Sequence, residues 1–245
     1  MKTLSFSVRN TKEILRDKLN LAFGLGFPVL VLLLLSLIQS NIPVEPFAID
    51  KLAPGIAVFG LSFISLFSGM LIAKDRTSAF MLRLFASPMT AVHFILGYTA
   101  PLVPIAIAQM AVCFAVAIPL GLECSARILL AIVVSLPAAL LFIGIGLFCG
   151  SVFTDKQVGG VCGALLTNLN AWLSGTWFDL NLVGGAFETL ANLLPFVHAV
   201  NAGRYALAGD YGSIWPELAW VAGYAVVIFA AAILVFTKKM HSDKV

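Results

Sequence analysis

The sequence has little charge and few residues of the kinds that perform chemistry. Only 11% of its 245 residues are charged, and it has 3 histidines. A membrane enzyme needs titratable or nucleophilic groups within reach of one another, yet His93, His198 and His241 are far apart in the sequence. The chain has no GxSxG nucleophile elbow, no HExxH motif and no carboxylate cluster. We therefore predict no catalytic residue.

Cysteine and phosphate-binding motifs are also missing. The four cysteines, Cys113, Cys124, Cys149 and Cys162, show no CxxC or Cys/His spacing, which argues against a disulfide framework and a metal site. No GxxxxGK[ST] loop is present, so the chain cannot by itself cradle a nucleotide phosphate in that way. We expect no cofactor to be bound by this chain.

Apolar side chains are abundant instead. The chain is 60% hydrophobic with a mean hydropathy of +1.01, which exceeds what a soluble core of this size could bury. A hydrocarbon layer about 30 Å thick needs roughly 20 apolar residues per helix. We predict an all-α membrane protein, a single domain over residues 1–245, with six transmembrane helices: Leu21–Ile38, Ala53–Ala73, Phe94–Pro119, Ile128–Gly150, Val158–Gly175 and Glu217–Thr237.

The ends of the chain are polar and basic. On a helix over residues 1–20, Leu4, Val8, Leu15 and Leu19 share one face and most charges lie opposite, which is typical of an amphipathic helix in the membrane interface. A frayed basic tail is the alternative. A signal peptide is disfavoured, because no small-x-small cleavage site follows the first apolar run.

The lysines and arginines are distributed unequally between the two sides of the predicted spans. Twelve of the 15 lie on the side of the termini, and the other three, Lys51, Arg127 and Arg204, lie on the opposite side. By the positive-inside rule both termini are cytoplasmic, and residues 238–245 form a cytoplasmic tail. The spans carry almost no charge away from their ends, which disfavours proton or sodium coupling.

The longest polar interval inside the chain runs from Ala73 to His93. We predict a short cytoplasmic helix here, between the second and third spans. Arg76 and Arg83 are two turns apart and point to one side, while Phe80, Leu84 and Met81 form an apolar ridge nearby. A ridge flanked by cations suits a groove with carboxylates at its rim. Alternatively, the arginines hold anionic headgroups at the inner leaflet.

The outer segment from Thr176 to Pro216 is long and rather apolar. Leu182, Phe187, Leu190 and Leu194 are predicted to form one helical face that Pro195 ends. A segment too polar to span and too apolar for water is expected to be re-entrant or interfacial, with its backbone covered by other helices. It connects the fifth and sixth spans.

Some polar and small residues lie within the spans. We expect interhelical hydrogen bonds rather than substrate contacts from the polar side chains of Gln109, Thr167, Asn168 and Asn170. Two GxxxG motifs, Gly146 to Gly150 and Gly159 to Gly163, predict close helix packing.

A stripe of aromatic residues runs along the second span. Phe59, Phe63 and Phe67 follow one another at four-residue spacing. We favour lipid-facing rings. The alternative is that the stripe, with Asn168 and Asn170, lines a pathway or a dimer interface.

Nearly the whole chain resembles the permease subunits of ABC-2 type transporters, mostly bacterial exporters. The residues that carry the resemblance are Pro54-Gly55, Leu84-Phe85-Ala86-Ser87-Pro88 with Gly97 after it, Ser174-Gly175 and Leu194-Pro195. Ala79 and Leu82 depart from the family's usual glycine and acid. The resemblance implies a cytoplasmic coupling helix that docks on a separate ATPase, carried here by Arg76, Phe80, Met81, Arg83, Leu84, Ser87 and Pro88.

The resemblance also implies partners and location. Two copies of an ABC ATPase would hold ATP and Mg, and a second permease subunit, identical or homologous, would complete the pathway. Membrane lipids surround the assembly in the inner or plasma membrane, and no nucleic acid is involved. The expected function is export of a hydrophobic or amphipathic substrate such as a drug, peptide, lipid or lipid-linked glycan. The alternatives are a small secondary carrier and a membrane-embedded enzyme or scaffold.

Overall fold

The computed structural model describes residues 2–42, 45–78 and 89–242, and every regular element within these ranges is a helix. Within these ranges, five helical stretches are long and apolar enough to cross a membrane: α2 (Lys18–Asn41), α3 (Ile49–Arg76), α5 (Ala91–Ala117), α6 together with α7 (Ala126–Val152), and residues Tyr211–Lys239 of α13 (Tyr211–Ser242). The all-α membrane class is thereby confirmed. The fifth predicted span falls on three consecutive segments, α8 (Asp155–Val158), the π-helix η2 (Gly159–Leu166) and α9 (Thr167–Leu173).

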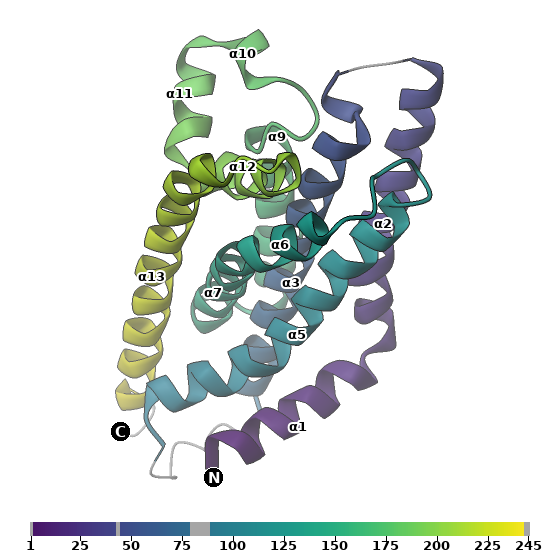
Figure 1. The fold of residues 1–245 in the computed structure, drawn as a ribbon. Helices are drawn as coiled ribbons and strands as arrows, with labels where there is room; N and C mark the ends of the chain where they lie inside the picture. Colours follow the sequence, from purple (N-terminus) through teal and green to yellow (C-terminus); the bar gives the residue numbers. More distant parts are fainter. Residues whose placement is uncertain (1, 43–44, 79–88, 243–245) are drawn as a thin grey trace.

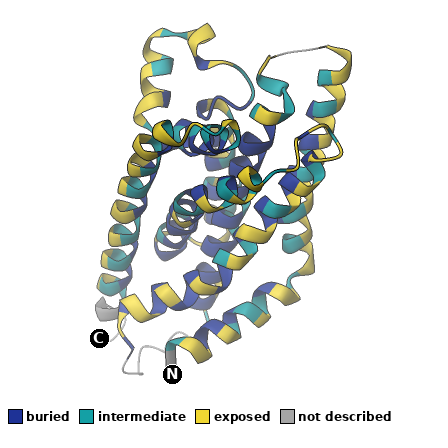
Figure 2. Cartoon of the chain, in the orientation of Figure 1, coloured by how far each residue is buried: buried dark blue, intermediate teal, exposed yellow. Residues whose placement is uncertain are grey.

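Helix α3 forms the centre of the molecule, and most of its residues are buried (Figure 2). It packs against α7 at Gly146 and Gly150, where a Cβ atom would overlap the backbone oxygens of Ser65 and Gly69. The first GxxxG motif therefore has its predicted role, since small residues let two backbones approach closely. In the second motif Gly159 faces open space, whereas a Cβ atom at Gly163 would lie 3.3 Å from the side chain of Leu66 on α3, so only its second glycine packs closely.

The N-terminal residues form α1 (Lys2–Arg16), which is separated from α2 by Asp17. The Asp17 carboxylate accepts a hydrogen bond from the backbone N–H of Asn20 and so caps α2. Helix α1 buries Phe6 and Ile14 against the bundle and leaves the predicted apolar face, which includes Leu4, exposed. This helix lies across the end of the molecule where α13 also ends (Figure 1).

The fourth predicted span is divided into two helices. Helix α6 (Ala126–Val134) ends at Ser135, and α7 (Leu136–Val152) begins with Pro137 in its first turn. Proline is favoured there because the backbone N–H groups of a first helical turn have no intrahelical acceptor, so the N–H that proline lacks is not needed. The division lets α6 pack on α12 while α7 packs on α3 and α13.

The outer segment differs from the predicted single helical face. Gly184, at φ 64°, separates α10 (Leu180–Val183) from α11 (Gly185–Leu193), so Leu182 belongs to another helix than Leu190. Leu182 is 82% exposed. Pro195 begins the next helix, α12 (Pro195–Ala208), because proline fits a first helical turn.

Helix α12 is the buried part of the outer segment. It lies across the bundle (Figure 1) and contacts α3, α6 and α13. Its N-terminal half presents Phe196, Val197 and Val200 to the core, and Gly209, at φ 83°, ends it in a left-handed conformation. Together with the short helix η1 (Glu45–Phe47), α10 and α11, it closes the end of the molecule opposite α1.

Candidate functional site

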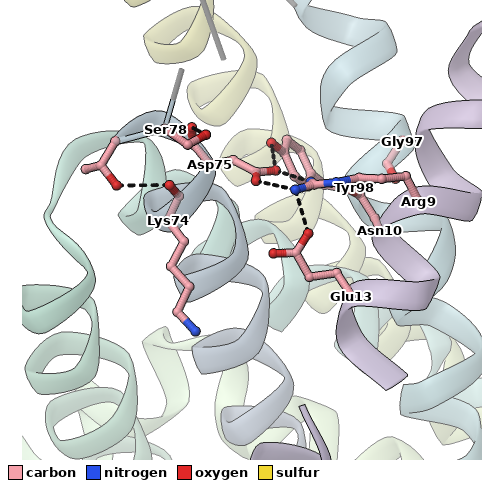
Figure 3. A network of polar contacts seen from close by, with 9 residues as sticks. Arg9, Asn10, Glu13, Lys74, Asp75, Ser78, Gly97 and Tyr98 are labelled. Atoms are coloured by element: carbon pink, nitrogen blue, oxygen red, sulfur yellow. Dashed lines mark hydrogen bonds and ion pairs between the residues drawn. The ribbon is translucent and has the colours of Figure 1, made fainter. Parts of the chain in front are cut away.

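Beside the predicted coupling helix, α3 ends in a buried carboxylate. Asp75 is 3% exposed, and Arg9 of α1 donates to both its oxygens, from Nη1 to Oδ2 at 2.5 Å and from Nη2 to Oδ1 at 2.8 Å. Tyr98 of α5 donates from its hydroxyl to Oδ2 at 2.8 Å. A buried charge is tolerated when it is paired and hydrogen-bonded. Three helices therefore meet at one carboxylate (Figure 3).

The neighbours of Arg9 extend this network along α1. Arg9 also pairs with Glu13 at 2.6 Å, and Asn10 donates to the backbone oxygen of Gly97 at 3.1 Å. A Cβ atom at Gly97 would overlap the ring of Phe6, so the glycine allows α1 to lie close to α5. The Phe6 ring is edge-on to Tyr98, with centroids 4.9 Å apart.

The network keeps its cation charged. Burial opposes the charged form of Arg9, but the hydrogen bonds from Arg9 to Asp75 and the charges of Asp75 and Glu13 raise the guanidinium pKa overall. Burial raises the pKa of Glu13, which Arg9 partly offsets. We call the group formed by Arg9, Asp75 and Tyr98 the α1–α3–α5 clamp.

Arg76 attaches the same end of α3 to a fourth helix. Its Nη1 donates to the backbone oxygens of Gly150 at 2.7 Å and Phe153 at 3.3 Å, at the C-terminal end of α7. A cation at this position complements the unsatisfied carbonyls and the negative end of the helix dipole. The other residues of the predicted coupling helix, Phe80, Met81, Arg83, Leu84, Ser87 and Pro88, lie outside the described residues.

A family model described as ABC-2 type transporter matches residues 2–208. The chain belongs to this family. The matched domain is the membrane permease domain of ABC transporters and does not include their nucleotide-binding domain. A search of the curated proteins gives no match to the chain.

The phenylalanine stripe of this ABC-2 permease does not face lipid as we favoured from the sequence. Phe59 and Phe67 are 5% and 8% exposed, because α2 covers them. Phe27 of α2 stacks near Phe63 with centroids 5.3 Å apart, and the ring of Phe67 fills the space above Gly24. The aromatic rings thus join α2 to α3 within one subunit.

Asn170 makes the interhelical bond that we predicted. Its side chain is fully buried on α9, and its Nδ2 donates to Ser62 Oγ at 2.9 Å and to the Val58 oxygen at 3.3 Å, both on α3. This bond anchors α9 to the central helix.

The other polar residues of the spans bond within their own helical runs. The exposed Asn168 donates to the Ala164 oxygen at 2.8 Å, and Thr167 donates to a backbone oxygen one turn before it. Gln109 is buried, and its Nε2 donates to the Cys113 sulfur at 3.3 Å. Asn168 therefore lies on the outer side of α9, opposite the side that Asn170 occupies.

Sequence reasoning did not find the clamp. Arg9 and Asp75 are 66 residues apart, and each was counted only as one charge in a polar flank. One signal was available: Asp75 is an acid within two residues of an apolar span, and a carboxylate so placed needs a buried cation or hydroxyl partner. The sequence alone does not indicate which cation is the partner of Asp75.

Proposed function

We propose that this permease is half of the membrane part of an ATP-driven exporter, working beside a second permease subunit and two copies of a separate ATPase that holds ATP and Mg. The observation that supports this most is the position of Asp75 and Arg76. These consecutive residues end α3 at the point where the predicted coupling helix begins, and they attach α3 to α1, α5 and α7. A displacement of the coupling helix by the ATPase would therefore move four helices together.

The proposed cycle follows from this attachment. ATP binding draws the two ATPases together, and they push on residues 76–88 of each permease. The push reaches α1 and α5 through Asp75, and α7 through Arg76. The two sets of helices tilt apart at their outer ends and open a route between the subunits. Packed helices held by a few discrete bonds move as bodies in this way.

We propose that each subunit crosses the membrane six times. Residues 155–173 run through α8, η2 and α9 without a break, and at about 1.5 Å per residue this stretch is on the order of 28 Å long, close to the hydrocarbon thickness. The charge bias puts α1 and the end of α13 in the cytoplasm. A reporter fused after Lys239 should then be cytoplasmic and one near Gly185 external, and the opposite result at either position would contradict six spans.

The apolar surface favours a hydrophobic or amphipathic cargo such as a drug, peptide, lipid or lipid-linked glycan. Helices α2 and α13 are apolar and largely exposed, so a lipid-soluble molecule can approach the subunit from the bilayer. The described spans hold no buried cation or acid near their midpoints that would bind a driving ion. The energy is therefore assigned to the ATPase.

Two variants separate docking from transmission. Phe80→Ala with Leu84→Ala removes the predicted apolar ridge and is expected to release the ATPase when the complex is purified. Tyr98→Phe removes one donor to Asp75 and leaves the predicted docking residues unchanged. It is expected to leave the ATPase bound while lowering efflux of a hydrophobic fluorescent dye several-fold.

The control is Tyr211→Phe, the same chemical change at an exposed residue at the other end of the molecule, which should leave binding and efflux unchanged. If the double variant keeps the ATPase and transports normally, residues 76–88 do not couple the two subunits. If Tyr98→Phe transports as well as the parent, the clamp does not transmit the movement.

A further inference from the structure

A polar cavity of about 280 Å³ lies at the end of the molecule opposite α1, enclosed by η1, the start of α3, the segment after α9, and α10 to α12. Its volume equals the share of roughly nine liquid waters. That is below the usual size of a site for a drug-sized molecule, and it suits one small polar group. Its lining includes two cations and three acids: Lys51, Arg204, Glu45, Asp179 and Glu188.

Arg204 is the cation that remains without a carboxylate. Its Nε donates to the Lys51 oxygen at 3.1 Å and its Nη2 to the Gly175 oxygen at 2.8 Å. These two bonds fix the guanidinium plane, and among the described residues no acid lies within ion-pair distance of it. Burial lowers the guanidinium pKa, and Asp50 and Asp179 offset this only through space. A fixed, half-buried guanidinium with donors left over is suited to bind a carboxylate or phosphate.

Glu188 supplies the opposite charge in the same cavity. Lys51 is already paired with Glu45, and Asp179 accepts from the Asn181 backbone and side chain. Glu188, in the first turn of α11, has no bond to a described side chain. Among the described residues, Arg204 and Glu188 are therefore a cation and an acid of this cavity, on different helices, that have no partner of opposite charge within ion-pair distance.

We propose that this cavity binds a small zwitterion, with its carboxylate or phosphate on Arg204 and its primary ammonium at Glu188. Both a free amino acid and the headgroup of phosphatidylethanolamine have this chemistry. A ligand with a single charge would leave either the guanidinium or the carboxylate without a partner. An unpaired charged side chain that is desolvated when the ligand binds reduces the binding free energy. Binding at this cavity requires neither the ATPase nor transport, so it stands apart from the proposed export.

The test measures thermal unfolding of the purified permease in detergent with probes up to about 10 mM, since a ligand of the native state raises Tm by mass action. Phosphoethanolamine and glycine should raise Tm, while inorganic phosphate and ethanolamine should not. Glu188→Gln should abolish the rise, and the control Glu123→Gln, an exposed acid in another loop, should retain it. Glu188→Lys should reverse the preference, so that inorganic phosphate now raises Tm.

The variants at Glu188 keep the fold testable, because this side chain makes no bond that holds the structure, whereas Arg204 also holds two backbone oxygens. Three results would overturn the proposal. Tm could rise as much with inorganic phosphate as with phosphoethanolamine, it could rise with none of the probes, or Glu188→Gln could respond to the probes as the parent does. Phosphatidylethanolamine nanodiscs separate the two sources. If they abolish the response to free phosphoethanolamine, the lipid headgroup occupies the cavity, and an unchanged response identifies a free zwitterion.

Discussion

Asp75 shows how a single buried charge can organise several helices. A carboxylate away from water is costly unless donors surround it, and here Arg9 and Tyr98 supply three hydrogen bonds. Each donor comes from a different helix than Asp75 does. The pairing therefore specifies how α1 and α5 lie against α3, which apolar contacts alone define less sharply.

Removing the cation of the clamp should be strongly destabilising. Arg9→Met keeps much of the side-chain volume but leaves Asp75 buried without its counter-charge, a loss typically of about 3–5 kcal/mol. We expect a clear fall in the unfolding temperature of the purified permease. Lys12→Met, the same loss of a cation at an exposed residue of α1, should change it little.

A double-mutant cycle distinguishes the pair from a general effect on α1. Adding Asp75→Asn to Arg9→Met removes the unpaired charge, so the double variant should be more stable than Arg9→Met alone. Additive losses would show that Arg9 and Asp75 act independently.

His198 of α12 forms a charged contact with α13. Its Nδ1 bonds to the carboxylate of Glu217 on α13, and its Nε2 bonds to the Asn192 oxygen at 2.8 Å. A carboxylate and a backbone oxygen both accept hydrogen bonds, so this pair of partners favours the doubly protonated, cationic imidazole. Burial opposes this charge, but the two hydrogen bonds raise the pKa of His198 overall.

This raised pKa predicts a loss of stability at alkaline pH. A group whose pKa is higher in the folded state stabilises fully below its unfolded pKa of about 6.5, and the contribution disappears as pH rises through the folded pKa. The unfolding temperature should therefore fall as the pH rises above about 6.5 and through the raised pKa of His198. His198→Gln should flatten this part of the profile, and the control His93→Gln, exposed at the other end of the molecule, should not. If the unfolding temperature of His198→Gln depends on pH as that of the parent does, another group causes the pH dependence.

At the scale of elements, the contact between α3 and α7 depends on the missing side chains of Gly146 and Gly150. Gly150→Ala introduces a methyl group against the Gly69 backbone, which cannot move aside as a flexible side chain can. Overpacking of this kind costs about 1–3 kcal/mol. The measurement is the unfolding temperature in detergent.

Gly159→Ala is the matched control, because its Cβ atom would meet no other atom within 4 Å and alanine favours a helical backbone by up to about 1 kcal/mol. Its stability should be equal or higher. Equal losses in the two variants would mean that backbone conformation, not interhelical distance, decides the effect.

The sequence predicted the long elements well because they depend on local composition. Runs of apolar residues specify the ends of α2, α3 and α5 to within four residues and those of α13 to within six, and α1 follows from its charge pattern. The breaks were less predictable. The division at Ser135 and the π-helix η2 depend on how neighbouring helices pack. The turn at Gly184 depends on a left-handed backbone conformation, which the spacing of Leu182 and Leu190 does not reveal. The clamp and the outer cavity were missed for the same reason, since their residues are distant in sequence.

For the whole molecule, the outward face of η2 and α9 is the best candidate for contact with a second subunit. It combines exposed apolar residues, Leu165 and Trp172 among them, with Asn168. One N–H of that amide bonds within its own helix, but an exposed amide in hydrocarbon is unfavourable and is better placed against another protein helix. Helices α2 and α13 present almost purely apolar faces, which suit lipid.

A cysteine cross-link tests this arrangement. In a two-fold dimer a residue near the axis meets its own copy, so Asn168→Cys, made together with Cys124→Ser to remove the exposed native thiol, should give a disulfide-linked dimer when membranes are oxidised. Leu234→Cys in the same background is the control, because this side chain is 70% exposed on α13 and should meet lipid and stay monomeric. A dimer through residue 234 with none through residue 168 would place the second subunit on α13 and would contradict a contact through η2 and α9. A dimer through residue 168 that disappears when ATP is bound to the ATPase would show, in addition, that these faces separate during the cycle.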